Sequence, residues 1–75
     1  MIKLYSKDNC PACNQAKKLL GRLKVEFIEL DLMDDEDKLN TFKALGYKQM
    51  PIIEIDGEVY STGFRPDMLR KLGGN

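Results

Sequence analysis

The hydrophobic period of the chain changes at Pro11, and this change restricts the fold more than any other feature of the sequence. Residues 1–5 (MIKLY) are an apolar run with one lysine, which predicts a strand, and residues 6–9 (SKDN) predict a polar loop. From Pro11 onward apolar residues recur at helical spacing, which predicts a helix over residues 11–23 with a buried stripe of Ala12, Ala16, Leu19, Leu20 and Leu23. Proline suits the first position of a helix, where its missing N–H costs nothing.

A second strand is predicted over residues 25–32 (VEFIELDL), where apolar and acidic residues alternate. A strand, a helix and a second strand in this order imply two parallel strands joined by a right-handed crossover. We expect the next helix to be capped by Asp34 or Asp35 and to end at Gly46. Its predicted buried stripe comprises Leu39, Phe42 and Leu45.

The last third of the chain predicts a hairpin and a helix. Residues 52–55 are a β-branched strand, and Asp56-Gly57 is a strong signal for a type I′ turn into a return strand over residues 58–61. Pro66 begins the last helix, with Met68, Leu69 and Leu72 facing inward, and residues 73–75 are expected to be a frayed tail. The order β-α-β-α-β-β-α predicts an α/β protein with a four-stranded mixed sheet flanked by three helices, which is typical of a thioredoxin-like fold.

Length and charge limit what such a chain can do. Its 75 residues suffice for one domain, over residues 1–75, and not for two. Twelve basic and twelve acidic residues cancel, which gives no support for binding to nucleic acid or to a membrane surface. No signal-peptide pattern is visible, and no run of about eighteen apolar residues could span a bilayer. We therefore expect a cytoplasmic protein.

The two cysteines, Cys10 and Cys13, are spaced C-x-x-C, and the chain has no histidine. The absence of histidine excludes imidazole catalysis and every metal site that needs imidazole. A disulfide across two residues removes little entropy from the unfolded chain, so structural stapling explains the pair poorly. In the reducing cytosol a C-x-x-C pair is more often catalytic or metal-binding.

The position of the pair predicts redox chemistry. Cys10 falls at the N-cap of the first predicted helix, where free N–H groups and the helix dipole favour a thiolate, so we expect its pKa to lie below the ordinary value for cysteine. Lys7 in the preceding loop would add to this effect, and Pro11 would make the start of the helix rigid. Cys13 lies one turn deeper on the same face as Cys10. We therefore expect Cys10 to be the nucleophile and Cys13 the resolving thiol.

Two other interpretations of the cysteine pair stay open. Zinc takes four ligands, so zinc or an iron–sulfur cluster would require two copies of the chain to share their cysteines. A purely structural pair is the other alternative. Redox chemistry is favoured because the pair falls at the strand-to-helix junction of a βαβ pattern.

Two further segments are candidates for binding a partner. Met50-Pro51 opens the third predicted strand. A proline is also tolerated at the first residue of a strand without any functional role. In the segment 63–67 (GFRPD), the plain interpretation is a strand end, a core phenylalanine and a helix start. The functional interpretation is an aromatic ring and a guanidinium, from Phe64 and Arg65, on a loop beside the cysteines.

The chain resembles the glutaredoxin and NrdH-redoxin branch of the thioredoxin superfamily over essentially its whole length. The matching segments are residues 5–13 (YSKDNCPAC), 46–51 (GYKQMP) and 62–68 (TGFRPDM). The last two look like NrdH-redoxins, whose pattern has a Gly-aromatic-x-Gln-x-Pro and a Ser-Gly-Phe-Arg-Pro segment.

This resemblance implies a dithiol–disulfide oxidoreductase that takes electrons from NADPH through thioredoxin reductase and donates them to ribonucleotide reductase. It implies that Cys10 and Cys13 are the redox pair, with no bound cofactor and no metal. Pro51 would be a cis proline facing the cysteines, and the backbone of Met50 would pair with an extended peptide of the partner. Gly63, Phe64, Arg65 and Pro66 would form the loop beside the partner groove. We expect the chain to act as a monomer.

Two departures from the NrdH pattern leave the reductant open. Ser61 stands where NrdH-redoxins commonly have tryptophan, and Ala12 stands where they commonly have glutamine, so the C-P-A-C pair is closer to the glutaredoxin Cys-Pro-Tyr-Cys. A missing tryptophan would open the groove to glutathione. The Thr-Val-Pro and Gly-Gly-x-x-Asp elements of glutathione-binding glutaredoxins are absent, however, which favours thioredoxin reductase over glutathione as the reductant.

The cancelled charges are unevenly distributed along the chain. Residues 1–25 carry six bases and one acid, residues 26–37 carry seven acids and no base, and residues 38–75 carry six bases and four acids. The basic segment around Cys10 would favour its thiolate and steer an acidic partner surface. Solvated helix faces are the alternative explanation.

Overall fold

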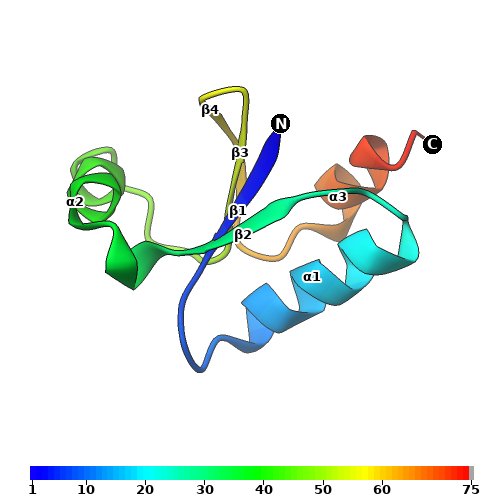
Figure 1. The fold of residues 1–75 in the computed structure, drawn as a ribbon, viewed down its shortest axis with the longest axis horizontal. Helices are drawn as coiled ribbons and strands as arrows, with labels where there is room; N and C mark the ends of the chain where they lie inside the picture. Colours follow the sequence, from blue (N-terminus) through cyan, green and yellow to red (C-terminus); the bar gives the residue numbers. More distant parts are fainter. Residues whose placement is uncertain (75) are drawn as a thin grey trace.

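A computed structural model describes residues 1–74 of the chain (Figure 1). The predicted order of strands and helices is confirmed. The elements are β1 (Ile2–Ser6), α1 (Pro11–Arg22), β2 (Ile28–Asp31), a 3-10 turn (Leu32–Asp34), α2 (Glu36–Ala44), β3 (Ile52–Ile55), β4 (Glu58–Thr62) and α3 (Pro66–Leu72). Within the described residues no helix combines the length and the apolar character needed to cross a bilayer.

The four strands form the predicted mixed sheet, in the order β2-β1-β3-β4. β1 and β2 run parallel, with Ser6 opposite Asp31. β3 runs antiparallel to both β1 and β4, which places Ile52 opposite Tyr5 on one side and opposite Thr62 on the other. The ends of β1, β2 and β4 and the start of β3 therefore meet at one end of the sheet.

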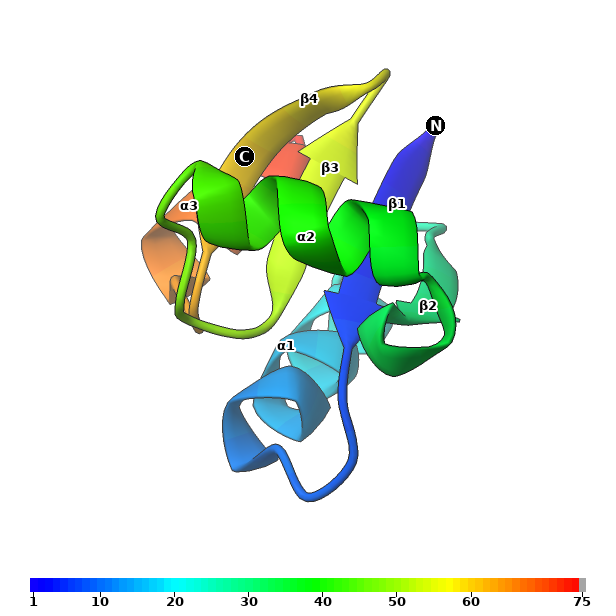
Figure 2. The same ribbon diagram turned by 90° about the vertical axis from the view of Figure 1, so that its left-hand side faces the viewer.

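Helices α1 and α3 cover one face of the sheet and α2 covers the other (Figures 1 and 2). Because successive residues of a strand point to opposite faces, neighbouring residues enter different cores. One core, beneath α1 and α3, comprises Leu4, Ala16, Leu20, Ile53 and Leu69. The other, beneath α2, comprises Tyr5, Leu32, Phe42 and Ile52.

A partly buried ion pair connects α2 to the sheet. The Nζ of Lys38 lies 2.7 Å from the Oε2 of Glu54, a residue of β3 that is 3% exposed. The same ammonium lies 5.8 Å from the ring centre of Tyr5 and 5.5 Å from that of Phe42. The hydrogen bond to Glu54 raises the pKa of Lys38, against the opposing effect of burial. The pKa of the Tyr5 hydroxyl is raised, first by burial and then by Glu54.

Most local signals in the sequence are confirmed. Asp35 is the N-cap of α2, and its Oδ1 accepts a hydrogen bond from the backbone N–H of Lys38 at 3.1 Å. In the hairpin turn Asp56 and Gly57 have φ values of 50° and 87°, as a type I′ turn requires. Pro11 and Pro66 both begin helices.

The predicted strand over residues 25–32 is too long. The ladder with β1 begins only at Ile28, because the preceding residues close helix α1. Lys24 has φ 57°, and the N–H groups of Lys24 and Val25 donate to the carbonyls of Gly21 and Leu20. This is the hydrogen-bond pattern of a Schellman helix end, and it holds Val25 out of the sheet. At the other end of the strand Leu32 enters the 3-10 turn.

The prediction that Leu45 is buried is wrong, since this side chain is 61% exposed. Leu45 is the C-cap of α2, and Gly46 reverses the chain behind it with φ 84°. The reversal brings Tyr47 back onto the helix, where its N–H donates to the carbonyl of Phe42 at 3.0 Å and the two rings lie 6.1 Å apart. Tyr47 thus packs against the core beneath α2, where the helical period predicted that Leu45 would lie.

The predicted frayed tail is wrong for Gly73, which is half-buried and caps α3 with a hydrogen bond from its N–H to the carbonyl of Arg70. The N–H of Gly74 donates to the carbonyl of Lys71 at 3.3 Å. Asn75, the last residue of the predicted tail, lies outside the described residues.

Candidate active site

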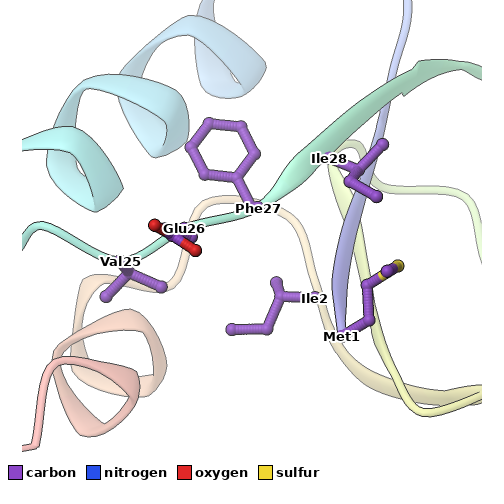
Figure 3. A pocket seen from close by; sticks show the side chains of 6 residues that line it. All are labelled: Met1, Ile2, Val25, Glu26, Phe27 and Ile28. Carbon is purple, nitrogen blue, oxygen red and sulfur yellow. The ribbon is translucent and has the colours of Figure 1, made fainter.

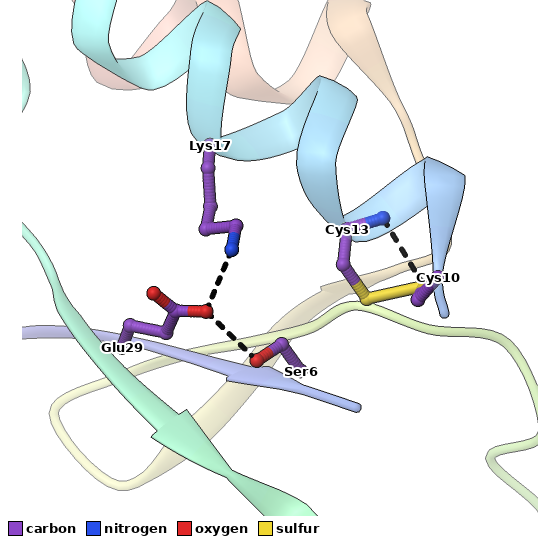
Figure 4. Close-up of polar contacts among 5 residues, drawn as sticks. All are labelled: Ser6, Cys10, Cys13, Lys17 and Glu29. Atoms are coloured by element: carbon purple, nitrogen blue, oxygen red, sulfur yellow. Dashed lines mark hydrogen bonds and ion pairs between the residues drawn. A yellow bond between two sulfur atoms is a disulfide. The ribbon is translucent and has the colours of Figure 1, made fainter. Parts of the chain in front are cut away.

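Cys10 is the N-cap of α1, as the sequence predicts. Its backbone is extended, with φ −118° and ψ 95°, and its Sγ accepts a hydrogen bond from the N–H of Cys13 at 3.1 Å (Figure 4). The carbonyl of Cys10 accepts from the N–H of Asn14, which closes the first turn. The first turn of α1 contains no acidic residue, so no carboxylate there repels a thiolate at Cys10. The first turn therefore favours negative charge on the Cys10 sulfur.

The two cysteines are joined as a disulfide, and their Cα atoms are 5.2 Å apart. The residues differ in access: Cys10 is 7% exposed and Cys13 is 1% exposed. Cys13 packs deep in the first turn of α1, on the same side of the helix as buried Ala16. The arrangement can store two electrons as a dithiol, and it offers Cys10 as the more accessible sulfur.

A polar network lies beside the disulfide (Figure 4). The Oε2 of Glu29 on β2 accepts hydrogen bonds from the Nζ of Lys17 at 2.8 Å and from the hydroxyl of Ser6 at 3.0 Å. The bond from Lys17 lowers the pKa of Glu29 most, and the bond from Ser6 adds to it, while burial acts in the opposite direction. One carboxylate thus joins α1, β1 and β2 beneath the redox pair. The sequence did not single out Glu29, because it is one of several acidic residues that alternate with apolar ones in residues 25–32.

Lys7 and Cys10 line the same hollow, of about 390 Å³, next to this network. Lys7 is exposed, and its ammonium forms no ion pair within residues 1–74. Pro11 is the first residue of α1, and the side chain of Ala12 is half-buried. The structure therefore places all three predicted supporting residues around Cys10, and among them Lys7 is an exposed charge without an ion-pair partner in residues 1–74.

The peptide bond between Met50 and Pro51 is cis, as the resemblance implies. Pro51 precedes Ile52, which pairs with Tyr5 near the end of β1, so the cis peptide lies at the end of the sheet that leads to Cys10. The N–H of Gly63 donates to the carbonyl of Pro51 at 2.9 Å. The sheet therefore brings the two predicted partner-binding segments together beside the strand that precedes the cysteines.

Gln49 packs directly on Gly63, a contact that sequence reasoning did not foresee. Gly63 has φ 75°, and a Cβ at this position would lie 2.6 Å from the Oε1 of Gln49. Glycine is thus required here by the backbone conformation and by the neighbouring side chain together. The two residues belong to separate segments of the sequence, 46–51 and 62–68, and only the pairing of β3 with β4 shows that they touch.

The rest of the segment 63–67 divides between core and surface. Phe64 is half-buried and packs against the core beneath α1 and α3, in agreement with the plain interpretation. Arg65 is exposed, and its guanidinium lies 3.3 Å from the carboxylate of Asp67. Pro66 is the first residue of α3. Ser61, one of the two departures from the NrdH pattern, is 8% exposed, and its hydroxyl has no hydrogen-bond partner within residues 1–74.

A second hollow lies away from the cysteines. It measures about 680 Å³ and lies at the start of β1 and just before β2, at the opposite end of the sheet (Figure 3). Its lining is apolar except for Glu26: Met1, Ile2, Val25, Phe27 and Ile28. It holds no nucleophile, so redox chemistry belongs to the other end. Residues 1–74 contain no cluster of three or more cysteines or carboxylates suited to a metal ion.

Comparison with known proteins places the chain in a family. A family model described as Glutaredoxin matches residues 2–60. The glutaredoxin-like protein NrdH of Salmonella typhimurium is 33% identical over 73 residues, which cover 95% of this chain and 86% of that protein. The glutaredoxin-like protein NrdH of Lactococcus lactis subsp. cremoris is 33% identical over 72 residues, which cover 96% of this chain and 99% of that protein.

The solved structure of NrdH-redoxin from Escherichia coli matches this fold with a TM-score of 0.85 at 24% identity, over 95% of this chain and 92% of that one. This likeness confirms the predicted thioredoxin-like fold. With the disulfide at the start of α1, the chain belongs to the glutaredoxin family as an NrdH-type protein, and it is a thiol–disulfide oxidoreductase.

Proposed function

We propose that the chain is a cytoplasmic, monomeric electron carrier that is reduced by thioredoxin reductase and reduces ribonucleotide reductase. The contact between Gln49 and Gly63 carries this proposal. It joins the two segments whose patterns resemble NrdH-redoxins, at the glycine whose N–H donates to the carbonyl of Pro51. The named relatives are NrdH proteins, which supports the same assignment.

The reaction uses the two sulfurs in sequence. The Cys10 thiolate attacks a sulfur of the partner's disulfide, which forms a mixed disulfide and releases one partner thiolate. The Cys13 thiolate then attacks the Cys10 sulfur, which closes the Cys10–Cys13 disulfide and releases the second partner thiolate. Two electrons pass to the partner, whose thiolates take up two protons, and thioredoxin reductase restores the dithiol. The greater exposure of Cys10 supports this order.

The surface around the cysteines supplies the partner contacts in this proposal. The backbone of Met50, before cis Pro51, pairs with the extended segment that carries the partner's cysteine. Gly63, Phe64, Arg65 and Pro66 flank that segment, with Arg65 as the exposed charge. Lys7, on the other side, contributes positive potential to the Cys10 thiolate.

Glutathione is the competing reductant. The small residue at position 61 was the feature that favoured it, but Ser61 is 8% exposed and so does not line an open groove. The segment that begins at Gly63 continues with Phe64 and Arg65, where glutathione-binding glutaredoxins continue with a second glycine. These features favour thioredoxin reductase.

Consumption of NADPH tests the proposal. The oxidised protein is mixed with NADPH and thioredoxin reductase, or with NADPH, glutathione and glutathione reductase. We expect turnover with the first system, and we expect the reduced protein to serve as the sole electron donor to ribonucleotide reductase. Turnover with glutathione alone would overturn the choice of reductant. Stoichiometric zinc or iron in freshly isolated protein would instead support a metal-bridged pair of chains.

A further inference from the structure

A groove between α1 and α3 combines an apolar floor with a basic rim. The two helices lie side by side on one face of the sheet (Figures 1 and 2). The groove has a volume of about 300 Å³. We call it the basic groove, and its main lining residues are Lys18, Leu19 and Arg22 from α1 with Phe64, Pro66 and Arg70 from the C-terminal segment.

The basic groove adjoins the loop of residues 63–66, because Phe64 and Pro66 line it. On α1 it starts at Gln15, two residues after Cys13 and on the exposed side of the helix. Gln15, Lys18 and Arg22 follow one another at spacings of three and four residues, which is one stripe of a helix surface. At about 1.5 Å per residue along a helix, this stripe extends from about 3 Å to about 14 Å beyond the level of Cys13. A polypeptide that contacts the loop of residues 63–66 can therefore continue over the groove.

The charges of the groove have one sign. None of its lining residues is acidic. Lys18, Arg22 and Arg70 are all exposed, and within residues 1–74 none of them belongs to an ion pair, whereas the neighbouring Lys17 and Arg65 each have a carboxylate partner. Three cations on the rim are thus available to an outside ligand. The seven acids of residues 26–37 lie elsewhere, in the segment that runs from just before β2 to the first turn of α2.

The floor of the groove supplies a different kind of contact. Leu19, Phe64 and Pro66 are half-buried, so each leaves apolar surface facing the groove. A small apolar pocket ringed by charges suits one anchoring side chain whose neighbours are oppositely charged, because the anchor gains affinity from burial and the charges align the segment.

We propose that the basic groove binds an acidic peptide segment with one apolar anchor, carried by the protein whose disulfide this chain reduces. The proposal goes beyond the electron-carrier function, because it concerns which polypeptide chemistry the surface recognises, whatever the source of the electrons. We infer an acidic ligand because the rim of the groove is positively charged and none of its lining residues is acidic.

Binding without turnover tests the proposal. Isotope-labelled oxidised protein is titrated, with NMR detection, with a short synthetic peptide in which one leucine is flanked by glutamates. We expect saturable shifts at the amides of Lys18, Leu19, Arg22, Phe64 and Arg70, and binding that weakens as salt is added. A second peptide with serine in place of leucine should bind at least about fivefold more weakly.

Arg70 and Lys71 provide a matched pair of variants on α3. Both are exposed, and only Arg70 lines the groove. We expect Arg70→Glu to weaken peptide binding about fivefold or more, and Lys71→Glu, with the same change of net charge, to change it by less than about twofold. Circular dichroism checks that both variants keep the fold.

Several results would overturn the proposal. These are equal weakening by the two variants, equal binding of the serine peptide, and absence of saturable binding. Tighter binding to vesicles of anionic lipid or to a single-stranded oligonucleotide at the same salt concentration would also overturn it, since the groove would then serve another class of ligand. Because no electrons are transferred in this experiment, its failure leaves the choice of reductase untouched.

Discussion

The backbone N–H of Cys13 donates a hydrogen bond to the Sγ of Cys10 across 3.1 Å. The first turn of α1 therefore directs a donor at one sulfur of the redox pair before any partner arrives. That sulfur belongs to the more exposed residue, since Cys10 is 7% exposed and Cys13 is 1% exposed. The cysteine that is reachable is thus also the one whose negative charge the helix end stabilises.

Replacement of either cysteine should have different consequences. We expect Cys10→Ser to abolish disulfide reductase activity, because Cys13 is too deeply placed to attack a partner. Cys13→Ser should still attack, and it should accumulate a mixed disulfide between Cys10 and the partner because the resolving thiol is gone. Mass spectrometry without reducing agent measures this species. If the trapped species formed in the Cys10 variant instead, the roles of the two cysteines would be reversed.

The Glu29 network predicts a small, acid-sensitive contribution to stability. Because Lys17 and then Ser6 lower the pKa of Glu29 in the folded chain, the network stabilises the fold above the ordinary pKa of 4.5, and this stabilisation is lost as the pH falls through the lowered value. The Glu29 side chain is 45% exposed, so we expect Glu29→Gln to lower the free energy of unfolding by only about 0.5 kcal/mol at neutral pH.

Urea unfolding at neutral pH and at a series of pH values below the ordinary pKa of Glu29 measures this contribution, which should shrink as the pH falls. Glu26→Gln is the control, because Glu26 is exposed and has no ion-pair partner within residues 1–74. An equal loss in both variants would contradict a role for the network.

The Lys38–Glu54 pair predicts a larger effect with the opposite dependence on pH. Lys38→Met leaves the Glu54 carboxylate buried without its partner, and we expect a loss of about 2 kcal/mol, below the usual range for a buried pair because the Lys38 side chain is 35% exposed. Since Glu54 raises the pKa of Lys38, the pair stabilises the fold below the ordinary pKa of 10.5, and this stabilisation disappears as the pH rises through the raised value.

Denaturant unfolding of Lys38→Met and of the wild type should therefore give curves that converge in strong alkali. Lys43→Met, at an exposed position of the same helix, should change stability by no more than about 0.5 kcal/mol. A gap between Lys38→Met and the wild type that persisted in strong alkali would contradict the assignment.

Replacement of glycine by alanine should have opposite effects on stability at two positions, Gly63 and Gly21. Gly63→Ala places a side chain at φ 75° and against Gln49, and we expect a loss of about 1–2 kcal/mol. Gly21 lies inside α1 with no atom within 4 Å of an added Cβ, so Gly21→Ala should gain about 0.5–1 kcal/mol.

Thermal unfolding compares the two glycine variants. Gln49→Ala combined with Gly63→Ala should recover only the part of the loss that comes from the side-chain contact, since the backbone conformation stays unfavourable. A shift of both single variants in the same direction would show that local space and φ do not govern these positions.

The local features of this protein follow directly from its sequence. The helix starts at Pro11 and Pro66, the cap at Asp35, the hairpin turn at Asp56-Gly57 and the cysteine at the helix N-terminus were all predictable. Each of them depends on backbone groups within about one turn of the residue concerned, so residue type and spacing are sufficient.

Tertiary structure decided which distant residues meet. Gln49 touches Gly63 because the start of β3 pairs with the end of β4, where Ile52 lies opposite Thr62. Lys38 reaches Glu54 because α2 crosses the face to which that strand residue points. The helical period alone could not show that Gly46 would turn Leu45 outward and bring Tyr47 in. A charge count along the chain likewise shows basic segments, but only the packing of α3 against α1 sets Arg70 beside Lys18 and Arg22. The redox pair was thus determined by sequence, and the surfaces around it by the fold, because side chains far apart in the chain become neighbours only when strand register and helix packing are set.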